Sequence, residues 1–230
     1  MNFSYTRGDD PKDVLENFTR MATALGVDRD RMTVSWQTHT VNVRRMTKAD
    51  EGKGVIIPRD YRDVDGMITD VPGQTLVTFY ADCVPLYLLD PVNRAIGLSH
   101  SGWRGTVKRM GQVTVDAMKE AFGTKPEDLI ACVGPSICRD CFEVGGEVAE
   151  EFREVFGPEH WEELYCRGKR PGKYQLDLWK ANEIIFREAG IRRENIHITN
   201  ICTMCNSDYL FSHRKVGEER GNLAAFLCLK

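Results

Sequence analysis

The sequence lacks any long apolar run, which excludes a membrane-spanning helix. Its most apolar stretch, residues 81–90 (ADCVPLYLLD), is interrupted by Pro85 and flanked by acidic residues, whereas a spanning helix needs about 18 apolar residues. Residues 1–14 also contain no apolar segment typical of a signal peptide. We therefore expect a cytoplasmic protein without membrane association.

An excess of either charge is also lacking. The 230 residues include 31 basic and 34 acidic side chains, for a net charge of −3. This balance gives no general electrostatic reason to bind nucleic acid. Tandem repeats, low-complexity tracts and Pro/Gly/Ser-rich linkers are absent, and the length suits one large domain or two small ones with a well-buried core.

Histidine is scarce, with five residues, whereas cysteine is plentiful, with eight. In a short secreted chain, eight cysteines would predict a disulfide framework. This chain is longer and shows no export signal, so reduced thiols are the better interpretation. Some are expected to be buried and others to ligate metal.

Helix-like and strand-like segments are interleaved along the chain. Apolar periodicity and capping residues predict helices at residues 11–25, 105–122, 147–156 and 177–189. Strands are predicted at residues 33–36, 39–43, 75–80, 84–89, 94–99, 129–133, 195–200 and 223–229. Residues 157–173 are charged and predict a loop. Because strand pairs also follow one another directly, a mixed-sheet α/β or α+β fold is favoured over a regular βαβ repeat.

Two of the five histidines and one cysteine lie at the ends of predicted strands, namely His39, Cys83 and His100. A thiolate with two imidazoles suits zinc or copper and disfavours calcium and magnesium. Three protein ligands leave a fourth position for water or substrate, which is typical of catalytic zinc. The spacing alone is also compatible with a buried thiol and two hydrogen-bonded imidazoles.

Two CxxC pairs, Cys138/Cys141 and Cys202/Cys205, supply four more thiols. Two such pairs form a four-thiolate structural zinc site in many proteins. We expect buried or redox-inert thiols here, with a second metal site as the alternative.

Five short motifs together resemble the YfiH/YlmD family, also called the laccase-domain or polyphenol-oxidase-like family. In chain order they are residues 37–39 (QTH), 81–83 (ADC), 100–105 (HSGWRG), 134–137 (GPSI) with 142–144 (FEV), and 211–214 (FSHR). The segment around His100 is the most specific of them, and the resemblance covers nearly the whole chain. His213 departs from the tyrosine that many relatives carry there.

The resemblance implies a single domain over residues 1–230 with a four-layer α/β/β/α fold. It also implies Zn²⁺ held by residues matching His39, Cys83 and His100, with copper as an alternative. The implied activity is that of a purine nucleoside phosphorylase acting on adenosine, inosine and S-methyl-5'-thioadenosine, with adenosine deaminase activity. A monomer or small homo-oligomer that takes a purine nucleoside and inorganic phosphate as substrates is expected.

Within this hypothesis, the catalytic residues are Asp82 and Arg104. Asp82 adjoins Cys83 and would transfer protons or orient a ligand. Arg104 lies in a glycine-flanked turn that leads into a helix, which is a suitable anion site. Substrate contacts are expected from Gln37, Arg104 and Arg214.

Three other functions remain open. In a cysteine hydrolase, Cys83 would be the nucleophile and His100 its base, with Asp82 or His39 as the orienting group. A copper-dependent polyphenol oxidase is disfavoured, because a multicopper cluster needs more histidines than the chain has. A metal-binding or partner-binding module without catalytic activity is the third.

Overall fold

The computed structural model describes residues 1–230, and its helices and strands alternate in a mixed order. The helices are α1 (Pro11–Leu25), α2 (Trp103–Val107), α3 (Met110–Phe122), α4 (Gly146–Val155), α5 (Trp161–Leu164), α6 (Leu178–Glu188) and α7 (His213–Val216). The strands are β1 (Met32–Val34), β2 (Val43–Arg45), β3 (Gly66–Thr69), β4 (Thr75–Tyr80), β5 (Val84–Asp90), β6 (Ala95–Ser101), β7 (Ile130–Val133), β8 (Glu143–Gly145), β9 (Tyr165–Arg167), β10 (Lys173–Leu176), β11 (Ile196–Ile198) and β12 (Leu223–Cys228). None of the helices is long and apolar enough to cross a membrane.

The strands form three sheets, and the two larger ones contain both parallel and antiparallel pairs. The largest has the strand order β11-β7-β5-β6-β3-β2, the second β1-β4-β12, and the third, small one β8-β10-β9. β1 pairs with β4 in parallel, whereas β12 pairs with β4 antiparallel. The mixed α/β fold predicted from the sequence is therefore confirmed.

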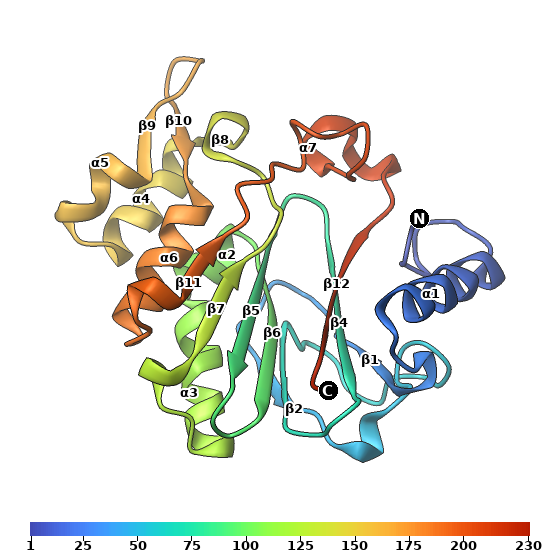
Figure 1. The fold of residues 1–230 in the computed structure, drawn as a ribbon. Coiled ribbons are helices and arrows are strands. Elements are labelled where there is room, and N and C mark those ends of the chain that lie inside the picture. Colours follow the sequence, from blue (N-terminus) through green and yellow to red (C-terminus); the bar gives the residue numbers. More distant parts are fainter.

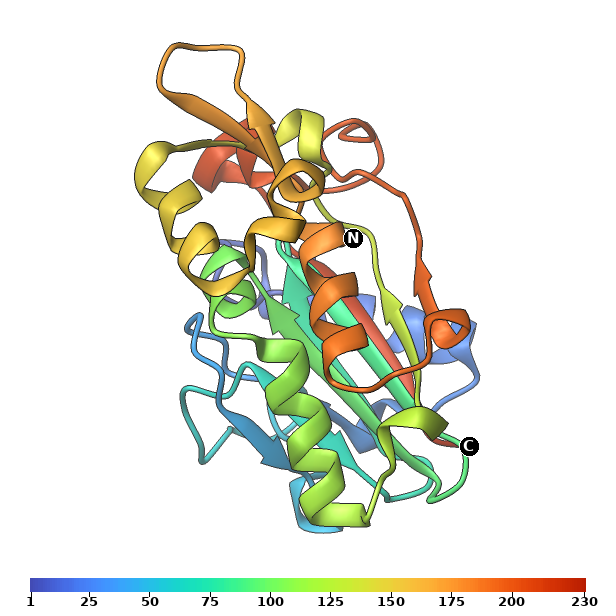
Figure 2. The ribbon, with the colours of Figure 1, turned by 90° about the vertical axis from the view of Figure 1, so that its left-hand side faces the viewer.

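Helices cover the outer faces of the two larger sheets, which gives the layer order α/β/β/α (Figure 1). α1 buries Val14 and Phe18 against the β1-β4-β12 sheet. The space between the sheets is filled by Leu76 and Leu98, among others. α3 and α6 lie on the far face of the six-stranded sheet, where Met118 and other apolar side chains pack (Figure 2). Burial of such apolar faces is the main force that holds the layers together.

The first helix shows how local sequence defines an element. Asp10 accepts a hydrogen bond from the Lys12 backbone N–H at 2.8 Å, and Pro11 occupies the first turn. Gly26 adopts a left-handed conformation, with φ of 64°, and ends the helix. The predicted bounds at residues 11–25 are confirmed.

The antiparallel pair β5 and β6 brings two of the predicted site residues together. In its register Pro85 lies opposite His100. Cys83 directly precedes β5 in the turn that follows β4, so it lies next to the end of β6 that carries His100. The predicted strands at 75–80, 84–89 and 94–99 are confirmed to within two residues.

Three sequence predictions are wrong in detail. Residues 39–42 form a loop, because a buried carboxylate captures their backbone N–H groups instead of a neighbouring strand. The helix predicted at 105–122 is two helices, since Arg109 takes a φ of 60° and ends the hydrogen-bond ladder between α2 and α3. The loop predicted at 157–173 contains α5 and β9, because Leu164, the last residue of α5, and Tyr165, the first of β9, are buried in the main core.

Candidate active site

His39, Cys83 and His100 converge, although they lie far apart in the sequence. Their ligand atoms all lie within 4.8 Å of one another. His39 comes from the loop between β1 and β2, Cys83 from the β4–β5 turn, and His100 from β6. The two imidazole rings meet edge to face, with centroids 5.0 Å apart. One sulfur and two ring nitrogens at this separation match the donors that zinc or copper prefers.

Gly102 makes this approach sterically possible. A Cβ atom at this position would lie 2.9 Å from Sγ of Cys83 and 3.2 Å from Cδ2 of His39. The backbone there, with φ of −70°, is open to any residue. The close approach of the Cys83 and His39 side chains, rather than backbone strain, therefore demands glycine.

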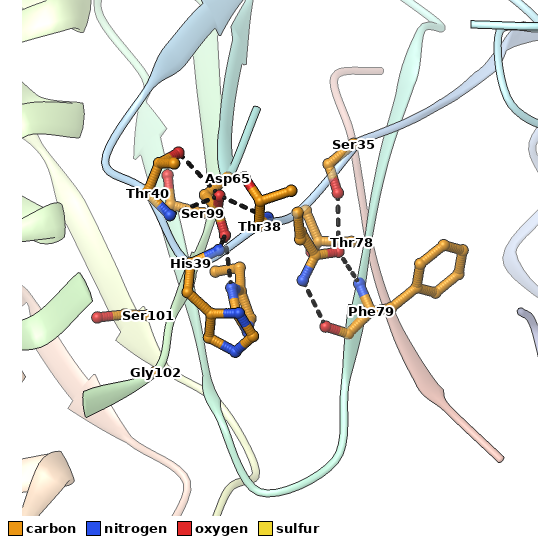
Figure 3. A network of polar contacts seen from close by, with 12 residues as sticks. Ser35, Thr38, His39, Thr40, Asp65, Thr78, Phe79, Ser99, Ser101 and Gly102 are labelled. Carbon is orange, nitrogen blue, oxygen red and sulfur yellow. Dashed lines mark hydrogen bonds and ion pairs between the residues drawn. The ribbon is translucent and has the colours of Figure 1, made fainter. Parts of the chain in front are cut away.

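Asp65 contacts both histidines of the candidate site, and the sequence predictions missed it. Its buried carboxylate accepts a hydrogen bond from Nδ1 of His100 at 2.8 Å, which leaves Nε2 of that ring to face the site. It also accepts the backbone N–H groups of Thr38, His39 and Thr40 at 3.0, 3.1 and 2.9 Å. Figure 3 shows this fan of contacts around Asp65. One carboxylate thus fixes a ring orientation and the loop that carries the other histidine.

Charges inside the trio stabilise a thiolate beside an imidazolium. Burial alone raises the pKa of Cys83, but the neighbouring imidazoles of His100 and His39 outweigh it and lower the pKa to about 6. Burial lowers the pKa of His100, yet Cys83 and Asp65 outweigh that effect and raise it to about 9. Burial also raises the pKa of Asp65, and the hydrogen bond from His100 with two backbone N–H groups brings it below its ordinary value.

Asp82 is buried and both its carboxylate oxygens are occupied. Oδ1 accepts the Thr203 hydroxyl at 2.6 Å, and Oδ2 accepts the Arg214 backbone N–H at 2.6 Å. Its φ of 83° places it at the tight turn before Cys83. In this arrangement Asp82 anchors two distant segments beside the site.

The remaining predicted residues lie in different surroundings. Gln37 borders the cavity described below, and its amide bonds the backbone of Phe79 in both directions at 2.7 Å. The Arg104 guanidinium lies over the ring of Trp103, 4.2 Å from its centroid. Arg214 donates to the Glu143 carbonyl at 2.8 Å. Neither arginine lines the cavity.

A cavity of about 340 Å³ opens directly onto the trio. Its lining is cationic and aromatic, and it contains no acidic side chain. The cations and aromatics are Arg7, Arg59, Arg220, Tyr5, Trp36, Phe79 and Tyr80. Such a volume suits a small organic ligand, and the excess of guanidinium groups favours an anion.

Arg220 is the arginine best placed to accept a ligand. Its Nε atom is buried and has no hydrogen-bond partner in the protein. A terminal nitrogen contacts the Asn222 side chain. Burial and the neighbouring Arg7 lower its pKa below the ordinary value. A buried donor without a partner is costly, and the guanidinium that carries it lines the cavity, where its charge favours an anionic ligand.

Comparison with known proteins agrees with the resemblance drawn from the motifs. The family model described as "Multi-copper polyphenol oxidoreductase laccase" matches residues 1–230. The chain belongs to this family. Among the relatives of this laccase-like chain is purine nucleoside phosphorylase YlmD of Geobacillus stearothermophilus, 33% identical over 99% of the chain and 82% of that protein. Another is adenosine deaminase RL5 from an unknown prokaryote, 34% identical over 93% of the chain and 81% of that protein.

Solved structures of the family share the fold. The crystal structure of the hypothetical protein YfiH from Bacillus licheniformis superimposes with a TM-score of 0.93 at 29% identity, covering 100% of this chain and 85% of that one. YlmD from Geobacillus stearothermophilus superimposes with a TM-score of 0.91 at 33% identity, covering 100% and 84%. The laccase-like family thus includes proteins named as enzymes of purine nucleoside chemistry.

Proposed function

We propose that this chain is a zinc-dependent purine nucleoside phosphorylase. Its substrates are adenosine, inosine or S-methyl-5'-thioadenosine together with inorganic phosphate, and its products are the free base and the corresponding ribose 1-phosphate. The observation that carries the proposal is the convergence of a two-histidine, one-cysteine ligand set on a cavity rich in arginine and aromatic residues. The names of the relatives support the same activity. A cytoplasmic location, which suits eight free thiols, belongs to the proposal.

The donor set fits one resident metal ion. His39, Cys83 and His100 would hold it, and the hydrogen bond from His100 to Asp65 gives the outer support that metal-bound histidines usually have. When bound, zinc supplies Lewis acidity at the reacting centre. Copper binds the same donor types and is the alternative metal.

A multicopper oxidase does not fit the histidines of this chain. The three histidines outside the trio lie elsewhere, on α7, on β11 and in the turn before α5. His160 contacts Glu163 at 2.7 Å, and none of the three joins a group able to hold a metal. The single histidine pair at the site therefore argues against the oxidase chemistry in the family's name.

Phosphorolysis needs an anion site beside a site for a planar base. Arg220 and Arg7 line the cavity and would bind phosphate through charge-assisted hydrogen bonds. Tyr5 and Phe79 line it as well and would offer apolar ring surface to a purine. Phosphate held in this way would attack the anomeric carbon of the ribose as the bond to the base breaks.

Adenosine deamination is the second activity proposed for the same cavity. Zinc deaminases use a carboxylate for proton transfer, but no acidic residue lines this cavity. The nearest carboxylates, Asp65 and Asp82, are engaged in hydrogen bonds. Phosphorolysis is therefore the favoured activity.

A cysteine hydrolase is the alternative that one observation favours. The lowered pKa of Cys83 and the raised pKa of His100 describe a thiolate–imidazolium pair, as cysteine nucleophiles require. Asp65 orients the imidazole from its other nitrogen. In that mechanism zinc would bind the Cys83 thiolate and inhibit turnover.

The test is product chromatography with zinc-loaded protein, adenosine and phosphate. We expect adenine and ribose 1-phosphate in the wild type and neither product with Cys83→Ala. Cys166→Ser, which replaces an exposed cysteine, serves as the matched control and should keep full activity. No turnover of the three nucleosides with phosphate present would refute the proposal. Activity on amides only in the zinc-free protein would instead establish the hydrolase.

Arginine variants locate the phosphate site. We expect Arg220→Gln to raise the KM for phosphate by about 10- to 100-fold, the equivalent of one charge-assisted hydrogen bond. The sequence-based assignment of the anion site to Arg104 predicts the same rise in the KM for phosphate with Arg104→Gln. In the structure, however, Arg104 lies over Trp103 and outside the cavity lining. Steady-state kinetics on both variants, with phosphate varied at saturating nucleoside, separates the two assignments.

A further inference from the structure

The two CxxC pairs lie side by side in space, and none of their four cysteines lines the cavity described above. β7 and β11 are parallel neighbours in the large sheet (Figure 1), so the segments that follow them leave the sheet together. Cys138 and Cys141 lie in the first segment, and Cys202 and Cys205 in the second. The backbone of Ser136 bonds that of the second segment in both directions, at 3.1 Å each. We refer to these thiols as the four-cysteine cluster.

The four sulfur atoms are spaced as around a metal ion. All lie within 4.8 Å of one another, and Sγ of Cys141 is 3.5 Å from Sγ of Cys205. Zn–S bonds of about 2.3 Å in a tetrahedron place neighbouring sulfurs about 3.8 Å apart. A disulfide would bring them to about 2.05 Å, and all eight cysteines are free.

Backbone donors point at the most buried of these sulfurs. The N–H groups of Cys138 and Cys205 donate to Sγ of Cys202 at 3.3 and 3.4 Å. Donors directed at a sulfur favour its thiolate form, which is the form that binds metal. The cluster therefore has outer support of the kind that metal sites use.

The segment that carries Cys202 and Cys205 has no helix or strand of its own to hold it in place. No helix or strand forms between the end of β11 at Ile198 and the start of α7 at His213. Long connections without regular structure are uncommon in compact proteins unless something else holds them. Within this one, the Thr203 hydroxyl bonds Asp82, the residue before Cys83.

We propose that the four-cysteine cluster binds a second, structural zinc ion. Four protein thiolates complete a tetrahedron and leave no open position, which distinguishes this site from the three-ligand site at the cavity. The ion ties the segment after β7 to the segment after β11. Through Thr203 it holds Asp82 and the turn of Cys83 in place. The proposal does not depend on the nucleoside activity.

Zinc content per chain in purified, reduced, full-length protein tests this assignment. Elemental analysis of Cys83→Ser, in which the cavity site is disabled, isolates the cluster. We expect one zinc per chain there and none after adding Cys141→Ser and Cys205→Ser. Adding Cys166→Ser instead, an exposed cysteine outside the cluster, should keep the one zinc. No zinc in Cys83→Ser, or zinc that survives loss of both cluster thiols, overturns the proposal.

X-ray absorption gives a second readout that needs no cluster variant. In Cys83→Ser the zinc edge should report four sulfur neighbours at about 2.3 Å and no nitrogen. A coordination shell that contains nitrogen or oxygen contradicts the proposal, and so does iron in place of zinc. A Cys141–Cys205 disulfide in protein purified under reducing conditions contradicts it as well. Chelation should also speed hydrogen exchange in residues 199–212 of the wild type, and unchanged exchange there contradicts the structural role.

Discussion

The carboxylate of Asp65 lies 2.8 Å from Nδ1 of His100, and the same buried carboxylate binds the backbone N–H of His39 at 3.1 Å. One side chain that is not itself among the candidate ligands therefore orients the His100 ring and holds the loop that carries His39. Outer partners of this kind typically change metal affinity by about 10- to 100-fold.

Replacing Asp65 by Asn should weaken zinc binding by about 10- to 100-fold, because the amide keeps the shape but loses the charge. Competition with a chromophoric chelator measures the affinity. Asp63→Asn is the matched control, since that exposed residue accepts bonds from the same loop but does not contact His100. Equal affinities of the wild type and Asp65→Asn would show that the carboxylate only shapes the loop.

Gly102→Ala should lower zinc affinity by about 10-fold or more while the fold is retained. The new methyl group would meet Cys83 and His39 at 2.9 and 3.2 Å and push the ligands apart. Gly105→Ala is the control in the same segment, since its nearest contact is 3.5 Å, an ordinary packing distance. Circular dichroism and zinc titration of both variants check this, and equal zinc binding by both would refute the steric argument.

The pH dependence of the alkylation rate of Cys83 in zinc-free protein should follow the lowered pKa of this thiol. The thiolate is the reactive form, so the rate should fall as pH drops through about 6 rather than through the ordinary range near 9. Peptide mass spectrometry after iodoacetamide treatment measures the rate at Cys83 alone. In His100→Gln the inflection should move to higher pH, because the imidazolium that stabilises the thiolate is gone; an unmoved inflection contradicts this cause.

Zinc binding near pH 7.5 at the His39, Cys83 and His100 site should release about one proton, measured in protein that carries Cys141→Ser and Cys205→Ser so that the four-cysteine cluster does not contribute. His100, with its pKa raised to about 9, is protonated there and must become neutral to bind metal, whereas Cys83 is already a thiolate. Calorimetry in buffers of different ionisation enthalpy counts the protons. The count should fall toward zero above pH 9, and a constant count across that range would show that another group supplies the proton.

Asp82→Asn separates a structural from a catalytic role. Both carboxylate oxygens accept hydrogen bonds from distant segments, so we expect a loss of about 1–3 kcal/mol in the free energy of unfolding. Asparagine tolerates the positive φ at this position. Denaturant unfolding measures the loss, and Thr203→Val, which removes one bond, should give a smaller one. Lost turnover without any loss of stability would mark Asp82 as the proton-transfer residue instead.

Local patterns determined much of the fold in advance. The helix at residues 11–25 follows from its own caps and apolar stripe, and the strands from residue 75 to residue 101 follow from short turns between apolar runs. The motifs around His39, Cys83 and His100 also indicated the candidate ligands. These signals are readable because each lies within a few residues of the chain.

Interactions between distant segments decided the rest. Asp65 precedes a strand that the sequence pattern did not reveal, and only folding brings its carboxylate to His39 and His100. The arginines of the cavity come from three separate regions. The two CxxC pairs meet because β7 and β11 pair in parallel. Sequence spacing carries no record of such long-range pairing, since burial and register across the whole sheet select it.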